Sequence, residues 1–447
     1  MTCASKPGVG VMVRGRTTVW AAALGLAAGL PGVAYAEGAA PGPLPTYRAA
    51  DGARAVEGKP STADAPLIEA GNVYADTLGP GERVYRLVLD KDESNVYVSA
   101  VVRPAAGAKV SGGDGIEVEI MTTAGRSCPG STGRANFGYD AYPIGAAGVR
   151  WGAEDADCAP AGVYYAKVTR TSAKGYDQSP WPLEIKVQRE PGRGPGAGPT
   201  TAPGSWPSGA PALPGSEPVA RSGGTGFNDA RALGAGVWRD EMRPGQTRYY
   251  RVPLDWGQQL GLSAELAAAK MTKSYGSASG GLTVSLYSPY RGLISDKDVS
   301  YDGKQAGVTF DRTPPVAYEN RFASDRSVQP VSLAGWYYVA VTMGSKVAEF
   351  TEDAAPVPLT LRLEVAGTPA KAPAYRGSPA AGGFGVGDED RAAAKEGLTA
   401  PEAAEAAERH SAMRVVAGAG FGAGTLLLLV LGGWTLLGRR GRGTTAG

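Results

Sequence analysis

The chain contains very little histidine and cysteine, and this scarcity excludes several kinds of active site. Its 447 residues include one histidine, His410, and three cysteines. Nucleophilic sites of the Ser-His-Asp or Cys-His type need an imidazole within the folded domain. His410 lies close to the C-terminal apolar segment, outside the β-rich regions described below. Those regions therefore have neither a histidine-dependent nucleophile nor a histidine-rich zinc site.

Two kinds of catalysis remain open on composition alone. A pair of carboxylates can hydrolyse a glycosidic bond when both converge in a cleft, and a Ser-Lys pair needs no histidine. No acidic constellation recurs in both of the repeats described below. We therefore expect a non-catalytic protein, with no cofactor and no catalytic residues.

The chain also lacks the basic excess that nucleic-acid binding requires. It has 45 Lys and Arg against 43 Asp and Glu. Seven of the basic residues belong to the terminal targeting and membrane segments, so the region between them is acidic by about five charges. No basic stripe is present there, and nucleic acid is not an expected partner.

The first 36 residues have the pattern of a secretory signal peptide. Arg14 and Arg16 precede an apolar, Ala-rich run over residues 17–33, and Ala34-Tyr35-Ala36 has the small-x-small form of a cleavage site. We expect the mature chain to begin near Glu37. The alternative is an uncleaved N-terminal anchor, for which the apolar run is short.

Residues 415–437 predict a transmembrane helix. They contain no charged residue, and about 20 apolar residues suffice to cross a bilayer. Arg439 and Arg440 follow directly, which places the tail, residues 438–447, in the cytoplasm. We expect a single-pass cell-membrane protein with its N-terminal region extracellular and the lipid bilayer as a partner. A buried helix of a soluble domain is the alternative.

Glycines within this segment permit close contact with another helix. Gly418 and Gly422 form a Gly-x-x-x-Gly pair, which allows helix backbones to approach. Gly and Ala are frequent throughout the chain, so composition alone also accounts for the pair. No LPxTG-like motif precedes the segment, and we expect it to remain as a permanent anchor.

The exported region contains one β-rich unit twice. Gly71–Asp90 and Gly236–Asp255 each have a Pro-Gly turn that leads into an alternating strand. Alternation places Tyr85, Leu87 and Leu89 on one face of that strand. The same face recurs as Tyr250, Val252 and Leu254, and further segments match in unchanged order: Val96–Ala100 with Leu260–Ala264, Gly115–Ile120 with Gly281–Leu286, Gly148–Trp151 with Gly307–Phe310, Ala161–Val168 with Ala334–Val341, and Pro182–Val187 with Pro358–Leu363.

These short alternating segments predict an all-β fold of two tandem β-sandwich, jelly-roll-like domains plus one C-terminal transmembrane helix. Within Gly115–Ile120, Ile116, Val118 and Ile120 should face inward, and Glu117 and Glu119 should face water. The expected divisions are a signal peptide (1–36), a flexible leader (37–61), repeat one (62–190), a Pro/Gly-rich linker (191–226), repeat two (227–367), a linker with a juxtamembrane helix (368–414), the transmembrane helix (415–437) and a cytoplasmic tail (438–447).

The repeated motifs resemble the bacterial pre-peptidase C-terminal domain family. The resemblance rests on the Pro-Gly turn before a Tyr-Arg strand, the GGLTVSLYSP segment, the Ala-Gly-x-Tyr-Tyr strand and the closing Pro-Leu strand. It covers both repeats and implies secreted β-sandwiches with accessory, substrate-binding or secretion roles. No protease domain accompanies them here. The composition is similar to that of high-GC actinobacterial proteins.

Some members of that family bind calcium, which draws attention to an acidic turn in repeat one. Asp90, Asp92, Glu93 and Asn95 lie together there. Repeat two has Asp-Trp-Gly-Gln-Gln at the matching place, and a solvated turn is the expected structure. We therefore expect no metal site.

Cys128 and Cys158 are the two cysteines that remain after export. An oxidising compartment favours a disulfide between them. The bridge would close a loop of about 31 residues and contribute roughly 3–4 kcal/mol on the loop-entropy model. Repeat two has no cysteine, so the bridge is expected to reinforce one long loop.

Aromatic residues are the remaining candidates for ligand contact, because repeat two is rich in them. They could form a stacking platform for sugar or a peptide-binding face, or they could belong to the sandwich core. The candidates are Trp238, Tyr249, Tyr275, Tyr287, Tyr290 and Trp336.

Together these features predict a membrane-anchored cell-surface protein with two non-catalytic modules. The expected role is to bind or present a protein or an envelope polymer such as the cell wall. The main alternative is an accessory subunit of a membrane or secretion complex, and an extracellular hydrolase is the third possibility.

Overall fold

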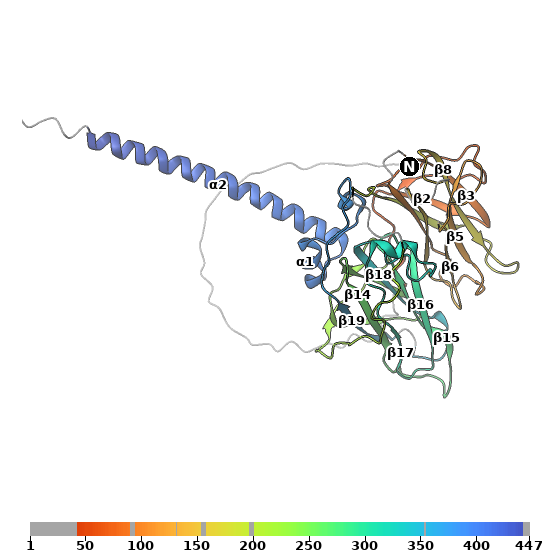
Figure 1. Cartoon of the computed structure of the whole chain (residues 1–447). Coiled ribbons are helices and arrows are strands. Elements are labelled where there is room, and N and C mark those ends of the chain that lie inside the picture. Colours follow the sequence, from red (N-terminus) through yellow and green to blue (C-terminus); the bar gives the residue numbers. More distant parts are fainter. Residues whose placement is uncertain are drawn as a thin grey trace, which may run out of the picture. The chain divides into compact units, whose positions relative to one another are not determined.

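A computed structural model describes residues 43–89, 94–130, 132–152, 158–195, 201–352 and 355–440. The predicted signal peptide, the acidic residues Asp90, Asp92 and Glu93, and the last seven residues of the tail lie outside these ranges. The described part is mostly β-structure arranged in four sheets (Figure 1).

The first two sheets form one β-sandwich. Their orders are β1-β2-β9-β4-β7 and β3-β8-β5-β6. The apolar residues of alternating strands meet between the sheets, as where Val98 and Trp181 from one sheet share a core with Tyr85 and Val118 from the other. The strands are β1 (Arg54–Ala55), β2 (Val73–Leu78), β3 (Gly81–Leu89), β4 (Asn95–Val102), β5 (Gly115–Thr122), β6 (Gly133–Asn136), β7 (Ile144–Arg150), β8 (Gly162–Thr171) and β9 (Trp181–Glu190).

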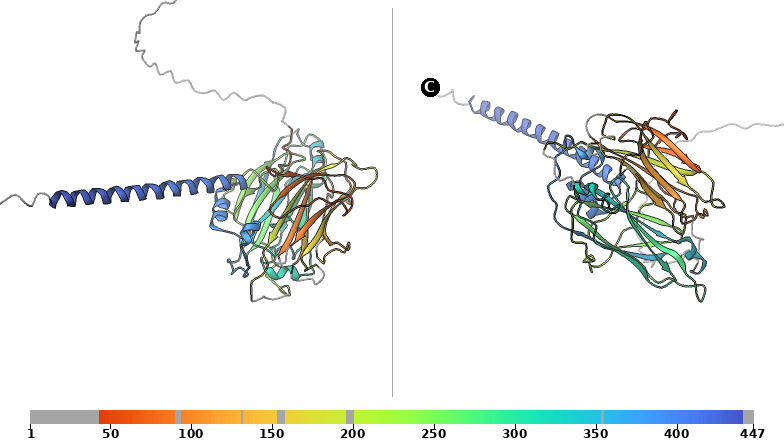
Figure 2. Two further views of the ribbon diagram at one scale, coloured as in Figure 1. Left: turned by 90° about the horizontal axis from the view of Figure 1, so that it is seen from above. Right: turned by 45° about the vertical axis from the view of Figure 1, so that its right-hand side comes forward.

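The other two sheets have the same order of strands. They run β10-β12-β19-β14-β17 and β11-β13-β18-β15-β16, with one extra short strand, β11. The colours of these strands run from green to cyan-blue in Figures 1 and 2. The strands are β10 (Val219–Ala220), β11 (Arg231–Ala232), β12 (Gly236–Met242), β13 (Thr247–Leu254), β14 (Gln259–Leu266), β15 (Ala278–Tyr287), β16 (Leu293–Tyr301), β17 (Ala306–Phe310), β18 (Gly335–Met343) and β19 (Val357–Ala366).

An Asp–Tyr hydrogen bond recurs in the two sandwiches, partly buried in the first and buried in the second. Tyr85 of β3 donates its hydroxyl to Asp76 of β2 at 2.7 Å, and Tyr250 of β13 donates to Asp240 of β12 at 2.7 Å. Each aspartate also accepts a backbone N–H from the segment that precedes the sandwich, Gly58 in one case and Gly223 in the other. The contact therefore joins the first long strand of each sheet in the sandwich to the other and to the chain before them.

The structure differs from expectation in the segments before, between and after the two repeats. The predicted flexible leader contains β1, which pairs with β2, and the predicted linker contains β10, which pairs with β12. The segment after repeat two is also packed, since Phe384 is buried and Tyr375 donates a hydrogen bond to Glu190. These segments form part of the folded body because backbone pairing and buried side chains hold them there.

The described residues contain three short 3₁₀ helices, of which η1 (Tyr318–Phe322) and η2 (Ser345–Glu349) lie between strands of the second sandwich and η3 (Pro379–Gly382) follows it. Two α-helices, α1 (Asp388–Glu396) and α2 (Ala400–Arg440), come after η3. The region in which one juxtamembrane helix was expected, residues 368–414, holds α1 and the start of α2, separated at Gly397, which adopts the left-handed conformation that ends α1 (φ 77°).

Helix α1 is docked on the second sandwich rather than free in solution. Arg391 of α1 forms an ion pair with Asp255 at 2.7 Å, and the Trp336 indole donates to Asp390 at 2.9 Å. Helix α2 includes Gly418 and Gly422. Across the side chains that the structure describes, no helix was found that is long and apolar enough to cross a membrane.

The alternation predicted from the sequence is confirmed on the inward faces. Tyr85 and Leu87 are buried, as are Tyr250 and Val252 of the second copy. Glu119 is an exception to the expected outward pattern, with an exposed fraction of 7%. It is covered because the Lys167 ammonium lies 2.5 Å from its carboxylate and the Ser127 hydroxyl donates to it.

Candidate functional site

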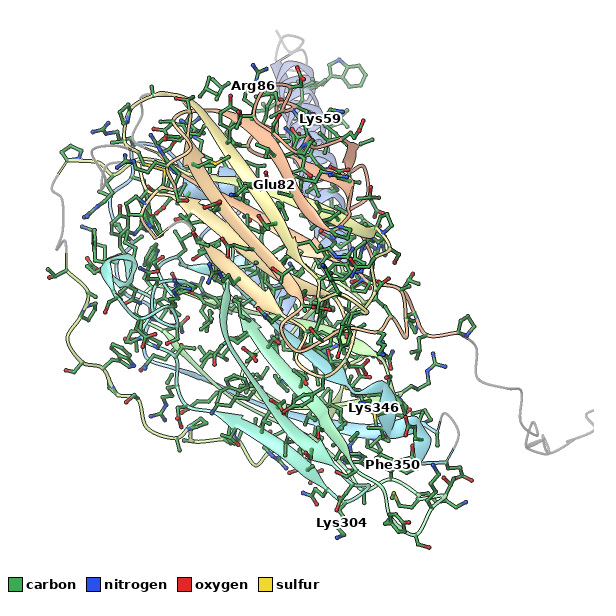
Figure 3. The ribbon with its side chains drawn as sticks, turned by 90° about the vertical axis from the view of Figure 1, so that its right-hand side faces the viewer. Lys59, Glu82, Arg86, Lys304, Lys346 and Phe350 are labelled. Carbon is green, nitrogen blue, oxygen red and sulfur yellow. A yellow bond between two sulfur atoms is a disulfide. The ribbon has the colours of Figure 1, made fainter. Side chains whose placement is uncertain are left out.

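The two outer faces of the first sandwich have different surroundings. The face of β3-β8-β5-β6 carries charged side chains such as Glu82 and Arg86, and Figure 3 shows both on the first sandwich, apart from Lys304 and Phe350 of the second. The outer face of β4, by contrast, packs against the second sandwich. Its Tyr97 ring stacks on Tyr290 with 4.4 Å between ring centroids.

A groove lies beside this contact and takes its walls from both sandwiches. Its larger part is a cleft of about 510 Å³ between β6 and β7 on one side and the start of β16 on the other. A second cavity of about 240 Å³ continues between β6 and strands β15 and β16. Arg134, Leu293 and Asp296 line both cavities, and we call the two together the interdomain groove.

The first-sandwich wall of the larger cleft is the segment closed by the disulfide. Cys128 and Cys158 are bonded, which confirms the pairing predicted from the sequence. Every first-sandwich residue that lines the cleft, from Gly130 to Trp151, lies between these two cysteines in the chain. The bridge therefore restrains the wall of the groove as well as a loop.

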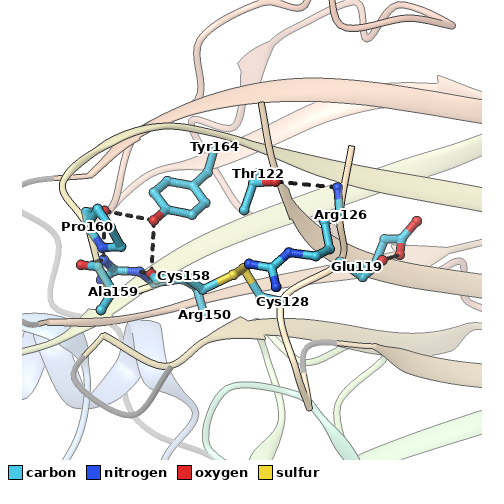
Figure 4. The surroundings of a disulfide bond; sticks show 10 residues. Glu119, Thr122, Arg126, Cys128, Arg150, Cys158, Ala159, Pro160 and Tyr164 are labelled. Atoms are coloured by element: carbon cyan, nitrogen blue, oxygen red, sulfur yellow. Dashed lines mark hydrogen bonds between the residues drawn. A yellow bond between two sulfur atoms is a disulfide. The ribbon is translucent and has the colours of Figure 1, made fainter. Parts of the chain in front are cut away.

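Arg150 fixes the other end of the same wall. Its side chain is fully buried (0% exposed) and donates to the backbone carbonyls of Ser94 at 2.7 Å and Cys158 at 2.6 Å. Tyr164 also donates its hydroxyl to the Cys158 carbonyl, at 2.9 Å (Figure 4). A buried cation satisfied by several carbonyls orders the chain that supplies them.

A buried Arg–Glu pair positions the second-sandwich wall at Tyr290. Arg291 reaches Glu184 of β9 at 2.6 Å, and both side chains are almost inaccessible. Arg291 has a φ of 63° and is the one described non-glycine residue in the left-handed region. A non-glycine residue keeps this strained backbone conformation only where surrounding contacts hold it in place. Here Glu184 and the Asn228 side chain, 2.7 Å from Arg291, supply the restraint.

A second buried pair holds the loop after η1, residues 326–330, which lines the larger cleft on the side of the second sandwich. Arg321 of η1 contacts Glu190 of β9 at 3.0 Å, and both side chains are fully buried. Glu190 also accepts hydrogen bonds from Asn95, Tyr97 and Tyr375 at 2.6–2.7 Å. Burial opposes ionisation of Glu190, but Arg321 and the hydrogen bonds outweigh it, so the pKa of this carboxyl is lowered.

Lys186 lies between these pairs on the covered face of β9. The residue is half-buried, and it shares one face of the strand with Glu184 and Gln188. Burial, together with the nearby Arg291 charge, lowers its pKa to about 7, although the Glu184 carboxylate opposes the shift. The covered face therefore contains one cation whose charge is unfavourable there.

The predicted aromatic residues do not form one platform. Trp238, Tyr249, Tyr287 and Tyr290 are buried, each at most 8% exposed, and Trp336 is partly covered beneath Arg251. Tyr275 is 87% exposed in a loop. Tyr287 and Tyr290 do line the groove, one in each cavity.

Sequence reasoning missed the residues that build the groove: Glu184, Glu190, Arg291 and Arg321. The second copy has Thr360 and Ala366 where the first has Glu184 and Glu190. Carboxylates on an outward strand face are equally typical of a solvated surface, so this difference did not indicate a covered face. The arginines that pair with these carboxylates were found only in the structure.

The described residues contain no group of three or more His, Cys, Asp or Glu side chains placed to hold a metal ion. Both histidine and cysteine nucleophiles are missing from the groove as well, since its lining consists of other residue types. The lining contains charged groups, hydroxyl groups, amide groups and partly covered aromatic rings. Groups of these kinds are used to recognise ligands.

Comparison with known proteins gives only weak structural matches. No family model matches the chain, and no curated protein matches it. Similar solved structures include the pre-peptidase C-terminal domain of a collagenase from Bacillus anthracis, at 18% identity and a TM-score of 0.18, over 28% of this chain and 95% of that one.

Two further matches extend over about two thirds of the chain. Tripeptidyl peptidase 2 has 8% identity and a TM-score of 0.20, over 69% of this chain and 27% of that one. The CBM22-1–CBM22-2 tandem domain of Xyn10C from Paenibacillus barcinonensis has 14% identity and a TM-score of 0.18, over 67% of this chain and 92% of that one. Scores this low transfer no function to this chain.

Proposed function

We propose that this chain is a non-catalytic, membrane-anchored binding protein of the cell surface, whose two sandwiches act as one rigid body. The interdomain groove carries the proposal, because both sandwiches contribute walls to it and three buried anchors hold those walls. The ligand is a protein or an envelope polymer. Tandem membership of the pre-peptidase C-terminal family is part of the same proposal and rests on the repeated sequence motifs.

The membrane anchor in this proposal is residues 415–437. The segment has no charged residue and is followed by Arg439 and Arg440, as expected of a stop-transfer helix with a cytoplasmic tail. Leu428 and Leu429, the central part of the segment, are each 72% exposed on α2. Protease added to intact cells should remove both sandwiches and leave a fragment that a C-terminal epitope detects. Resistance until the cells are lysed would contradict this topology.

Binding can be tested by filling the groove. Thr132, in the wall of the larger cleft, is changed to Trp, and the exposed loop residue Ser274 is changed to Trp as a matched control. Full-length chain in mild detergent is then mixed separately with cell-wall sacculi and with the secreted-protein fraction. We expect wild type and Ser274→Trp to bind one of these probes, and Thr132→Trp to bind at least about tenfold more weakly, a loss of about 1.4 kcal/mol.

Two results would redirect the proposal. If neither probe binds, or if Thr132→Trp binds as wild type does, the groove is not a binding site. If a stoichiometric membrane protein copurifies and Thr132→Trp leaves it in place, the chain is an accessory subunit held through another surface.

A further inference from the structure

The interdomain groove contains charged side chains of both signs that have no ion-pair partner in the described part of the chain. Asp296 and Asp298 of β16 line the smaller cavity, and Arg326 lines the larger one. Among the described residues, no ion pair involves any of these three, whereas Arg134, where the cavities meet, is paired with Glu117. Asp298 marks an acidic end in the smaller cavity and Arg326 a basic end in the larger cleft, while Asp296 lines both cavities; all three are available to a ligand.

Two sheet edges also meet the groove. Strand β6 is the last strand of β3-β8-β5-β6, and β16 is the last strand of β11-β13-β18-β15-β16. Within the residues that the structure describes, each pairs along one side only, β6 with β5 and β16 with β15. An edge strand presents unpaired N–H and C=O groups that an extended chain can pair with.

The aromatic rings in the larger cleft are poorly placed to stack on a sugar. Trp151 is 7% exposed and Tyr290 is 3% exposed. The face of the Tyr290 ring is already covered by Tyr97. Tyr139, 56% exposed, offers an open ring only in the smaller cavity. The lining thus favours main-chain pairing and charge recognition over ring stacking.

We infer that the interdomain groove binds an extended polypeptide segment as an added strand on the edge of β16. A Lys or Arg side chain of that segment lies beside Asp296 and Asp298, and a carboxylate of the segment lies beside Arg326. This assignment rests on the proposed binding function and specifies its ligand class.

The electrostatics of the acidic end agree with this assignment. Asp296 and Asp298 are two positions apart on one strand and so share a face. Asp296 is exposed, but the protein around its carboxyl partly desolvates it and raises its pKa, and the neighbouring Asp298 carboxylate raises it further. A ligand cation placed there removes the repulsion between the carboxylates, so binding is strengthened at the acidic end.

The test uses the full-length chain in mild detergent and a library of ten-residue peptides randomised at every position. We expect the selected peptides to carry a basic residue at one position and an acidic residue at another. The double change Asp296→Asn with Asp298→Asn should lower the affinity for such a peptide by about five- to tenfold. The same double change should not affect the peptide in which the basic residue is replaced by Gln.

Two further measurements examine the basic end and the main-chain pairing. Arg326→Gln should remove the preference for the acidic residue, whereas Asp311→Asn and Lys371→Gln, exposed changes outside the groove, should alter neither preference. In an extended peptide, alternate backbone N–H groups point to the same edge. Methylating the nitrogens of the edge that pairs with β16 should lower the affinity of a selected peptide by at least about tenfold, and methylating the other set should not. Hydrogen exchange of the β16 amides should slow on binding.

The outcomes separate this inference from the proposed function. If Thr132→Trp weakens binding of sacculi or of the secreted fraction, but no peptide is selected at the groove and a polysaccharide binds there, the polypeptide assignment is wrong and the binding function stands. Selected peptides that keep their affinity in the Asp296, Asp298 and Arg326 variants also overturn the assignment. If Thr132→Trp changes the binding of no probe, the proposed function itself fails.

Discussion

Changing Glu190 to Gln tests whether the two sandwiches are held as one body by buried charge. The Glu190 carboxylate accepts two hydrogen bonds from Arg321, at 3.0 and 3.2 Å, and further ones from Asn95, Tyr97 and Tyr375. The amide of Gln has one acceptor oxygen and an NH₂ group that would face donors. Arg321 would then be a buried cation without a counter-charge. Removing one partner of a buried pair costs about 3–5 kcal/mol.

The assay is equilibrium unfolding in urea, followed by tryptophan fluorescence. Trp151 is a suitable probe, because the Arg321 guanidinium lies 5.0 Å from the centre of its ring. The matched control is Glu364→Gln, which breaks the Arg312–Glu364 pair on β19. That pair has side chains 23% and 15% exposed, and partly solvated pairs contribute about 1 kcal/mol or less.

The comparison between the two variants decides the result. We expect Glu190→Gln to lose several times more unfolding free energy than Glu364→Gln, and the double change Glu190→Leu with Arg321→Met to recover part of the loss, since no buried charge remains. A loss for Glu190→Gln equal to that of the control would refute the reasoning. It would mean that the covered face of β9 is hydrated.

Three other perturbations follow from the same structure. Replacing Cys128 and Cys158 with Ser should lower the unfolding free energy by about 3–4 kcal/mol and weaken groove binding, and a variant with unchanged affinity would show that the bridge does not support the wall. Lys186→Met should flatten the stability profile measured in urea between about pH 7 and 10. The pKa of Lys186 near 7 in the folded state lies below the value of about 10.4 in the unfolded state, so the unfolded chain binds more protons there and stability rises with pH in wild type. An equal rise in the variant would contradict this. Gly223→Ala places a Cβ 2.7 Å from a ring atom of buried Tyr250 and should cost about 1–3 kcal/mol in thermal unfolding, whereas the linker control Gly209→Ala meets no atom within 4 Å and should be neutral.

Much of the secondary structure could be predicted because local patterns determine it. Alternation in PLEIKV places Leu183, Ile185 and Val187 on one face, and all three are fully buried in the first sandwich. Pro-Gly turns marked the starts of β3 and β13, and the two cysteines of repeat one left a single possible pairing within it. The short strands β1 and β10 were not predicted, because two residues carry no periodic signal.

The candidate site was predictable only in fragments. Tyr287 and Tyr290 were noted for their aromatic content, and both line the groove. Asp296, Asp298 and Arg326 lie in ordinary polar sequence and carried no signal. Their importance arises because β16 and the loop after η1 lie beside β6 and β7 of the other sandwich.

By itself, the sequence determined the repeated β-unit, the inward faces of its strands and the disulfide. These depend on neighbours along the chain, on period-two alternation and on residue chemistry. Only the tertiary structure decided that the outer face of β9 is covered. Alternation shows that Glu184 and Glu190 share a face, but it cannot show that Arg291 and Arg321, 107 and 131 residues away, pair with them. Packing over such separations joins the sandwiches and creates the groove between them.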